Sequence, residues 1–367
     1  SVGGQPYIVA RAQGAHVWDV EGNEYLDLVQ SYGAVILGHA HPAITAAVTA
    51  AAPEGTSYGA PTPREMKLAE AIVGRVESCD QVRFMNSGTE ATSTAVRLAR
   101  GYTGRDRVVI FHGNFHGATD ALLAAGGSGV ATLGLPGTAG VPAGAVAETM
   151  VVPYNQVPEL DDTVACVIVE PVAANMGVIP PQPGFLEGLR AECDRVGAVL
   201  VFDEVITGFR LGGGGAKGRY GVRPDLTTFG KVIGGGLPIG AVGGRRELME
   251  TLTPLGAVFH AGTLAGNPIA TAAGLAALDL LDDDLYTTLT ARAERFATLM
   301  GDACATGGFD AQFPTVGTLV GMVCGDIEPP TDFESAKRTD EAAYARFFHA
   351  MLREGVAMAP GAYEAIF

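Results

Sequence analysis

The chain has 367 residues, 47% of them hydrophobic, which is enough for a sizeable core in about two domains. Its 40 acidic and 24 basic residues give a formal net charge of −16, and this argues against a nucleic-acid-binding protein, which needs a basic face. No apolar run reaches the roughly 18 residues of a membrane helix, and no signal-peptide pattern opens the chain. We therefore expect a cytoplasmic protein that does not bind a membrane.

The numbers of glycine, cysteine and lysine residues are informative as well. The 51 glycines are about twice the usual share. The five cysteines are scattered without a CxxC pair, which is typical of reduced thiols in the cytoplasm. Lysine is rare, with only Lys67, Lys217, Lys231 and Lys337 in the whole chain. The sequence begins with SVGG and ends with YEAIF, and each end falls in the middle of a structural segment. We therefore expect the complete protein to extend beyond both ends.

The first part of the chain is predicted to be β-rich. Short strands are expected at 7–10 and 16–18, and the turn residues at 19–23 precede a further strand. Helical spacing of apolar residues predicts helices at 42–52 and 63–76.

From residue 81 the pattern changes to strands that alternate with helices. The runs VACVIV and AVLVF are continuously apolar, as expected of parallel strands buried on both faces. Such alternation predicts an α/β domain with a mostly parallel sheet. The expected strands are 81–85, 107–111, 164–169 and 198–202, and the expected helices are 87–100 and 185–196.

The remaining chain combines a long loop with a second set of elements. Ala118–Ala147 is rich in Gly, Ala and Pro without a clear period, and so long a loop is usually functional or mobile. Helices are predicted from Pro268 to Cys304. A strand at 316–323 and a helix at 341–353 indicate a smaller domain.

Asp203 follows the predicted strand at 198–202. An acid at the carboxyl end of a central strand is well placed to bind a ligand, because open α/β sheets bind ligands there. A helix cap or a surface ion pair would explain the residue equally well from its position alone.

Lys231 lies in the segment FGKVIGGG. A desolvated lysine has a lowered pKa, so its neutral amine becomes available for Schiff-base chemistry. Glycine on both sides lets the backbone and a ligand approach closely. Most lysines instead extend their ammonium into solvent, but the apolar neighbours of Lys231 argue against that interpretation.

The segment Asn86-Ser87-Gly88-Thr89-Glu90 lies at a predicted strand-to-helix junction. Free N–H groups and the positive end of the helix dipole make such a junction a binding site for phosphate. Ser87 and Glu90 also fit a plain capping box, and the two interpretations are compatible.

Together the three features describe one ligand. A phosphate at a helix N-terminus, a carboxylate for a ring nitrogen and a Schiff-base lysine specify pyridoxal phosphate, PLP. In this hypothesis Asp203 keeps the pyridine nitrogen protonated, and Lys231 both attaches the cofactor and moves a proton as a base.

The same segments resemble the class III aminotransferases, which have the fold-type I architecture. The motifs that carry this resemblance are FMNSGTEA, VIVEPVAANMGVIPPQPGFLEGLR, LVFDEVITGFR, DLTTFGKVIGGGLPIGAVGGRRE and HAGTLAGNP. Within that family, GSGVATLGLPGTAGVP and APGAYEA are similar to the glutamate-1-semialdehyde 2,1-aminomutases. The resemblance covers essentially the whole chain.

The resemblance implies an architecture and an activity. The fold would be a large domain with a mostly parallel sheet at 46–265 and a small α/β domain formed by 1–45 and 266–367. The activity would be the PLP-dependent conversion of glutamate 1-semialdehyde to 5-aminolevulinate in tetrapyrrole biosynthesis. Ala118–Ala147 would form a gate that retains the intermediate.

The resemblance also implies a role for individual residues. Lys231 and Asp203 would be catalytic, Val205 would pack under the ring, Phe115 would stack on it beside His116, and Asn175 would lie near its hydroxyl group. The phosphate would be held by Ser87, Gly88 and Thr89. Gly262 and Thr263 would also bind the cofactor, with Thr263 reaching that of the other subunit in a homodimer. Tyr32 and Glu364 would contact the small-molecule amino or semialdehyde substrate.

Several positions differ from the family pattern. Tyr32 replaces the usual Trp, Phe115 replaces the usual Tyr, and Ala118 replaces a His. An Ala at position 174 also replaces a Gly, and the family's substrate-carboxylate arginine would lie before residue 1. Loss of the Tyr hydroxyl and the His removes polar groups near the reacting atoms. The changes therefore leave two alternatives open: an aminotransferase with a separate amino donor and acceptor, such as those of specialised metabolism, and a PLP-dependent epimerase.

Two histidine pairs have the spacing of metal ligands. They are His39 with His41, and His112 with His116. No carboxylate or cysteine completes either set in the sequence, so we expect no metal site.

Overall fold

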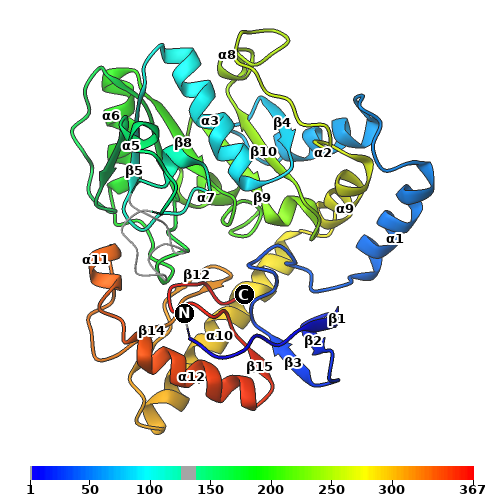
Figure 1. The fold of residues 1–367 in the computed structure, drawn as a ribbon, viewed down its shortest axis with the longest axis vertical. Helices are drawn as coiled ribbons and strands as arrows, with labels where there is room; N and C mark the ends of the chain where they lie inside the picture. The colour runs from blue at the N-terminus through cyan, green and yellow to red at the C-terminus, as the bar shows by residue number, and fades with distance from the viewer. Residues whose placement is uncertain (1, 125–137) are drawn as a thin grey trace.

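The computed structural model describes residues 2–124 and 138–367. Figure 1 shows a larger part, in which helices surround a central sheet, above a smaller part that contains both the N-terminal strands and the C-terminal helices.

The larger part is built on a sheet of seven strands. Strand β10 is antiparallel to β4 and to β9, and the remaining neighbours are parallel to each other. The mostly parallel sheet predicted from the sequence is therefore confirmed. In spatial order the strands are β4 (Gln81–Met85), β10 (Gly240–Gly244), β9 (Leu226–Gly230), β8 (Val199–Asp203), β7 (Val164–Val169), β5 (Arg107–Phe111) and β6 (Thr149–Val152).

Helices cover both faces of this sheet. In β7, Val167 and Val169 pack in one cluster with residues of α6 (Phe185–Val196), whereas Cys166 and Ile168 pack in another with α3 (Gly88–Thr103). Alternate residues of one strand thus contact opposite helical layers, which is why the strand sequences are continuously apolar. The other helices of this part are α1 (Pro42–Ala51), η1 (Ala52–Glu54), α2 (Pro63–Val73), η2 (Asp120–Leu122), α5 (Ala143–Val146), α7 (Gly215–Tyr220), η3 (Lys231–Gly234), α8 (Arg246–Met249) and α9 (Pro268–Leu278).

Strand β10 was not predicted, because three of its five residues are glycine. The structure explains the glycines by close packing. A Cβ atom at Gly240 would lie 2.1 Å from the carbonyl oxygen of Ser87, and one at Gly244 would lie 2.4 Å from that of Asp225. The strand can therefore occupy this place only without side chains at these positions.

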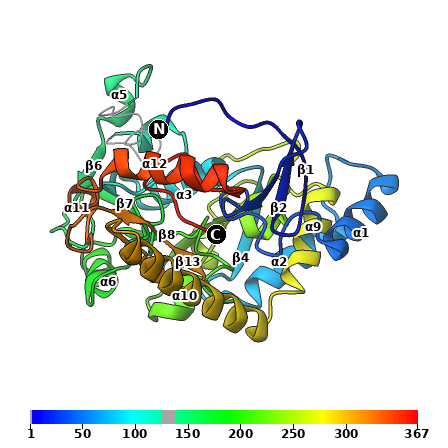
Figure 2. The same cartoon turned by 90° about the horizontal axis from the view of Figure 1, so that it is seen from below.

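The smaller part joins the two ends of the chain in one sheet. Its strand order is β1-β2-β3-β15, and β15 runs parallel to β3. Helix α12 packs against β15, whereas α10 packs against the short strands β11, β12 and β13, and Figure 2 shows both helices from below. The predicted union of N- and C-terminal segments is confirmed, while the boundaries at residues 45 and 265 stay a prediction. The elements are β1 (Val9–Gln13), β2 (His16–Asp19), β3 (Glu24–Asp27), α10 (Asp283–Thr306), β11 (Ala311–Gln312), β12 (Thr315–Val316), β13 (Leu319–Val320), β14 (Val323–Cys324), α11 (Phe333–Ala336), α12 (Glu341–Arg353) and β15 (Val356–Ala357).

Some predicted elements differ from the structure. The strand expected at 7–10 begins at Val9, and the helix expected at 63–76 ends at Val73, before a glycine. The strand expected at 316–323 is wrong, because the chain turns back at Gly317, whose φ is 55°. This glycine allows the tight connection between β12 and β13, which pair antiparallel.

The predicted long loop at 118–147 includes the short helices η2 and α5. Much of the expected gate, residues 125–137, lies outside the described residues. All five cysteines are buried. Within the described ranges, no helix is both long and apolar enough to cross a membrane, and no group of three His, Cys, Asp or Glu side chains is placed to hold a metal ion.

Candidate active site

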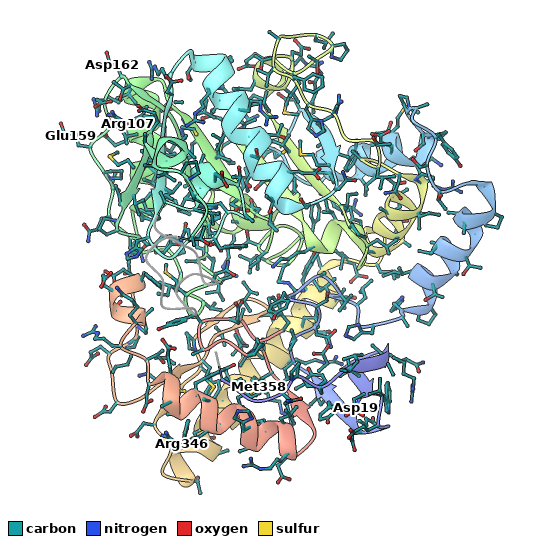
Figure 3. The ribbon with its side chains drawn as sticks, in the orientation of Figure 1. Asp19, Arg107, Glu159, Asp162, Arg346 and Met358 are labelled. Carbon is teal, nitrogen blue, oxygen red and sulfur yellow. The ribbon has the colours of Figure 1, made fainter. Side chains whose placement is uncertain are left out.

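The carboxyl ends of five parallel strands meet at one cavity of about 210 Å³. The opposite edge of the sheet is marked in Figure 3 by Arg107 at the start of β5, with Glu159 and Asp162 close to it. The site therefore lies where open α/β sheets bind ligands. The cavity is lined by Ser87, Gly88, Thr89, Thr92, Phe115, His116, Gly117, Glu170, Asn175, Asp203, Val205, Ile206 and Lys231.

The N-terminus of α3 forms one wall of this cavity. Ser87 caps the helix, since its Oγ accepts a hydrogen bond of 3.2 Å from the N–H of Glu90. The Glu90 side chain in turn accepts from the N–H of Asn86 at 2.8 Å. Ser87 is therefore the N-cap, although Glu90 bonds to Asn86 and not back to Ser87 as a full capping box requires, and Ser87 also lines the cavity. The first N–H groups of the helix have no acceptor in a preceding turn, so this wall offers donors and positive potential to an anion.

Gly88 is required by the packing behind this wall. A Cβ atom at this position would lie 3.0 Å from both methyl groups of Val205. Val205 follows Asp203 closely in the chain, so a side chain at Gly88 would disturb the loop after β8.

Asp203 is the last residue of β8 and is buried. Its Oδ2 atom lies 2.7 Å from Nδ1 of His116, which donates because an ionised carboxylate only accepts. Its Oδ1 atom accepts from the N–H of Val205 at 3.1 Å and from the Thr228 hydroxyl at 3.0 Å. These three donors fix the orientation of the carboxylate.

His116 carries a further buried polar atom. Its Nε2 has no hydrogen-bond partner among the residues that the structure describes. The backbone carbonyl of His116 accepts from the Thr92 hydroxyl at 2.7 Å, which fixes the loop against α3. A buried nitrogen without a partner at the wall of a cavity is expected where a polar ligand completes the site.

Lys231 begins the turn η3 directly after β9. Its φ of 47° is unusual for a residue with a side chain, and such strain is frequent at functional sites. Burial lowers the pKa of its ammonium to about 8, against the opposing charges of Glu170, Glu364 and Asp203. A substantial fraction of the amine is therefore neutral, and thus nucleophilic, slightly above neutral pH.

The structure brings together most of the residues that the sequence predicted. Nine of them line the cavity: Ser87, Gly88, Thr89, Phe115, His116, Asn175, Asp203, Val205 and Lys231. Four do not line it. Gly262 packs near the Asn86 side chain and Thr263 is exposed. Tyr32 is 44% exposed. Partial burial, and then the charge of Glu364, raise the pKa of Tyr32, and the same charge opposes the lowering of the Lys231 pKa.

Sequence reasoning missed Glu170, which is buried in the wall of the cavity. Its pKa is raised to about 7, chiefly by burial. A signal was present, because Glu170 follows the fully buried strand β7 just as Asp203 ends the buried strand β8. Thr92 was missed as well, since one hydroxyl on a helix carries no distinctive pattern.

The arrangement offers three complementary functions within one cavity. The helix N-terminus at Ser87–Thr89 can bind a phosphate. Asp203 can hold a protonated ring nitrogen, and Lys231 can attack a carbonyl carbon. The unpartnered Nε2 of His116 supports the view that a polar group belongs here. The donor set therefore fits a phosphorylated pyridine aldehyde.

Comparisons with known proteins agree with this geometry. The family model of class III aminotransferases matches residues 1–363. A glutamate-1-semialdehyde 2,1-aminomutase of Desulfovibrio desulfuricans is 50% identical, over 99% of this chain and 88% of its own length. The aminomutase of the same name from Syntrophobacter fumaroxidans is 49% identical, over 100% of this chain and 86% of its own length.

Solved structures extend the comparison. An omega-transaminase from Sphaerobacter thermophilus superposes with a TM-score of 0.90 and 33% identity, covering 98% of this chain and 86% of that one. A glutamate-1-semialdehyde aminomutase from Pseudomonas aeruginosa gives a TM-score of 0.87 and 28% identity, covering 100% and 83%. The chain therefore belongs to the class III aminotransferase family.

Proposed function

We propose that the protein is a PLP-dependent aminomutase that converts glutamate 1-semialdehyde to 5-aminolevulinate. The observation that carries the proposal is the cavity in which Lys231, Asp203 and the N-terminus of α3 converge. Related transaminase structures contain PLP, and the aminomutase relatives are about half identical over the full chain.

Several residues of the cavity would bind the cofactor and orient it. When bound, PLP supplies an electron sink that allows an amino group to move between carbon atoms. Ser87, Gly88 and Thr89 would hold its phosphate with helix N–H groups and hydroxyls. Asp203, fixed by His116, would keep a proton on the ring nitrogen.

Lys231 would anchor the cofactor and then act as a base. Its lowered pKa of about 8 would let the amine accept a proton from one carbon bonded to the migrating nitrogen and return it to the carbon on the other side of that nitrogen. Phe115 and Val205 both line the cavity and would enclose the ring from opposite sides. The overall reaction is an isomerisation, so it needs no external amino donor.

An aminotransferase with separate donor and acceptor is the second candidate. The observation that favours it is the similarity to transaminase structures, including a β-phenylalanine aminotransferase from Variovorax paradoxus with a TM-score of 0.86 and 33% identity. Phe115 and Ala118, where the family usually has Tyr and His, point in the same direction because they remove polar groups from the site.

The active unit would be a homodimer. Thr263 is exposed and lies outside the cavity of its own chain, so it is free to reach the phosphate site of a second copy. Phe259 and Leu264, on the same segment, are 67% and 55% exposed. Exposed apolar residues around a loop of this kind are typical of a protein interface.

One assay separates the two candidates. The purified holo-protein is given glutamate 1-semialdehyde alone, and 5-aminolevulinate is measured. The aminomutase proposal predicts turnover without any added amino donor. Turnover that appears only with a donor and a separate acceptor would replace the aminomutase by the aminotransferase.

A further inference from the structure

The side chain of Glu170 connects two separate walls of the cavity. Its Oε1 atom accepts a hydrogen bond of 2.5 Å from the backbone N–H of Phe115. Its Oε2 atom accepts from the Asn175 amide at 3.0 Å and from the N–H of Ala174 at 3.2 Å. The two oxygens thus hold the loop that follows β5 on one side and the loop that follows β7 on the other.

The backbone of Glu170 strengthens the same connection. Its N–H donates to Oδ1 of Asn114 at 2.8 Å, and its carbonyl accepts from the Tyr154 hydroxyl at 3.3 Å. Because Asn114 precedes Phe115, the residue is tied to that loop by its main chain as well as by its side chain. Such a closed network has few alternative arrangements, so it defines the width of the cavity.

Glutamate is required here because its carboxylate, the ionised form that predominates above its pKa of about 7, is acceptor-only. The side chain faces three N–H donors, and two oxygens without a hydrogen satisfy all of them. An amide in its place would present an NH₂ group to one of the two walls, and this wall would lose its acceptor. A buried N–H donor that has lost its acceptor costs free energy. We therefore expect that wall to move.

Glu204 provides an internal comparison. It is also buried, also follows a central strand, and has a pKa that burial likewise raises to about 7. Its Oε2 atom accepts from the N–H of Ala216 at 2.6 Å and from the Thr207 hydroxyl at 3.1 Å. Neither it nor these partners line the cavity. The two acids thus share burial and position but differ in what they hold.

We propose that Glu170 is a positioning residue for the cofactor, holding Phe115 and Asn175 at the separation that the ring requires. This inference rests on the proposed PLP site but does not depend on which substrate the enzyme uses. Phe115 and Asn175 would contact the ring, while Glu170 acts on it only through them.

The test compares Glu170→Gln with Glu204→Gln, both prepared as holo-protein. Three quantities are measured: the dissociation constant of PLP, the visible absorption maximum of the bound cofactor, and the unfolding temperature. For Glu170→Gln we expect a dissociation constant raised at least about tenfold and a shifted absorption maximum, because one ring-contacting wall loses its acceptor. For Glu204→Gln we expect PLP affinity within about twofold of the wild type and an unchanged spectrum.

A double variant tests the connection itself. If Glu170 acts through Asn175, the effects of Glu170→Gln and Asn175→Ala on PLP affinity will be less than multiplicative when combined. If Glu170→Gln shows no cooperative unfolding, Glu170→Asp replaces it, since its shorter carboxylate cannot reach both walls. Either variant is expected to weaken PLP binding.

The outcomes separate the inference from the proposed function. A wild-type chain that binds no PLP overturns the proposed function, and this inference with it. A wild type that binds PLP, together with Glu170 and Glu204 variants that bind it equally well, overturns the inference alone. Multiplicative effects in the double variant also contradict it, because they mean that Glu170 and Asn175 act independently.

Discussion

The imidazole of His116 and the carboxylate of Asp203 lie 2.7 Å apart, and both side chains are buried at the cavity. The loop after β5 is thereby joined to the end of β8, two strands away in the sheet. The contact fixes the direction in which the Asp203 carboxylate faces the cavity, and this direction matters for every step that depends on a protonated ring nitrogen.

The Asp203–His116 contact predicts that Asp203→Asn loses activity rather than structure. The His116 ring can accept from the new amide in its other tautomer, so the contact survives, but the negative charge is lost. We expect kcat to fall by about 100-fold or more, measured in the amino-transfer assay, with little change in unfolding temperature. Asp194→Asn, which changes an exposed carboxylate paired with Arg190, is the control. Full activity of Asp203→Asn would show that the charge has no role.

The lowered pKa of Lys231 predicts how cofactor binding depends on pH. The ordinary value of 10.5 is lowered to about 8 by burial, so the neutral, nucleophilic amine accumulates as the pH rises through 8. The rate of covalent PLP attachment to apo-protein, followed by visible absorbance, should rise up to about pH 8 and then level off. A rate that continues to rise toward pH 10.5 would mean that the amine is not desolvated.

The packing of Gly88 predicts a local effect of one methyl group. Gly88→Ala places a Cβ atom 3.0 Å from the Val205 methyl groups, so Val205 must move and the phosphate wall with it. We expect a loss of about 1–3 kcal/mol in stability and weaker PLP binding, measured by denaturant unfolding and by titration. Gly301→Ala is the matched control. Gly301 lies within α10 with nothing near its added Cβ, and this substitution should stabilise the protein by about 0.5–1 kcal/mol. Equal effects of the two substitutions would contradict the packing argument.

Glu204 predicts a pH dependence of stability with a definite sign. Its pKa is raised from 4.5 to about 7 in the folded protein, so between these values the folded state holds a proton that the unfolded chain has lost. The stability that this provides is present below pH 4.5 and is lost as the pH rises to 7. Glutamine does not titrate, so the stability of Glu204→Gln relative to the wild type should increase by about 1–3 kcal/mol over this range. The free energy of unfolding of both proteins is measured from pH 4.5 to 8. A constant difference between variant and wild type over this range would refute the pKa shift of Glu204.

Much of the large domain could be predicted because its strands and helices have clear patterns. Strands β5 and β7 and helix α6 begin and end where the apolar runs predicted. Strand β10 could not be predicted, since its glycines reflect contacts with residues distant in the sequence. The hairpin at Gly317 was missed because a left-handed glycine divides a segment whose Val, Leu and Met residues resemble one strand.

The site shows the same division. Lys231, Asp203 and the α3 N-terminus have local signals, namely apolar surroundings, a strand end and capping residues. Glu170 has the strand-end signal too, but its importance comes from Phe115, 55 positions earlier in the chain. That pairing exists only because β5 and β7 are neighbours in the sheet.

The central claim is that Lys231 holds the cofactor, and the scarcity of lysine makes this directly measurable. The holo-protein is reduced with borohydride and digested, and mass spectrometry identifies which of the four lysines carries the pyridoxyl group. We predict the modification at Lys231 alone, and its absence from Lys231→Ala but not from Lys217→Ala, where the changed lysine pairs with Glu77 away from the cavity. Modification at Lys67, Lys217 or Lys337 instead, or at no lysine, would contradict the account.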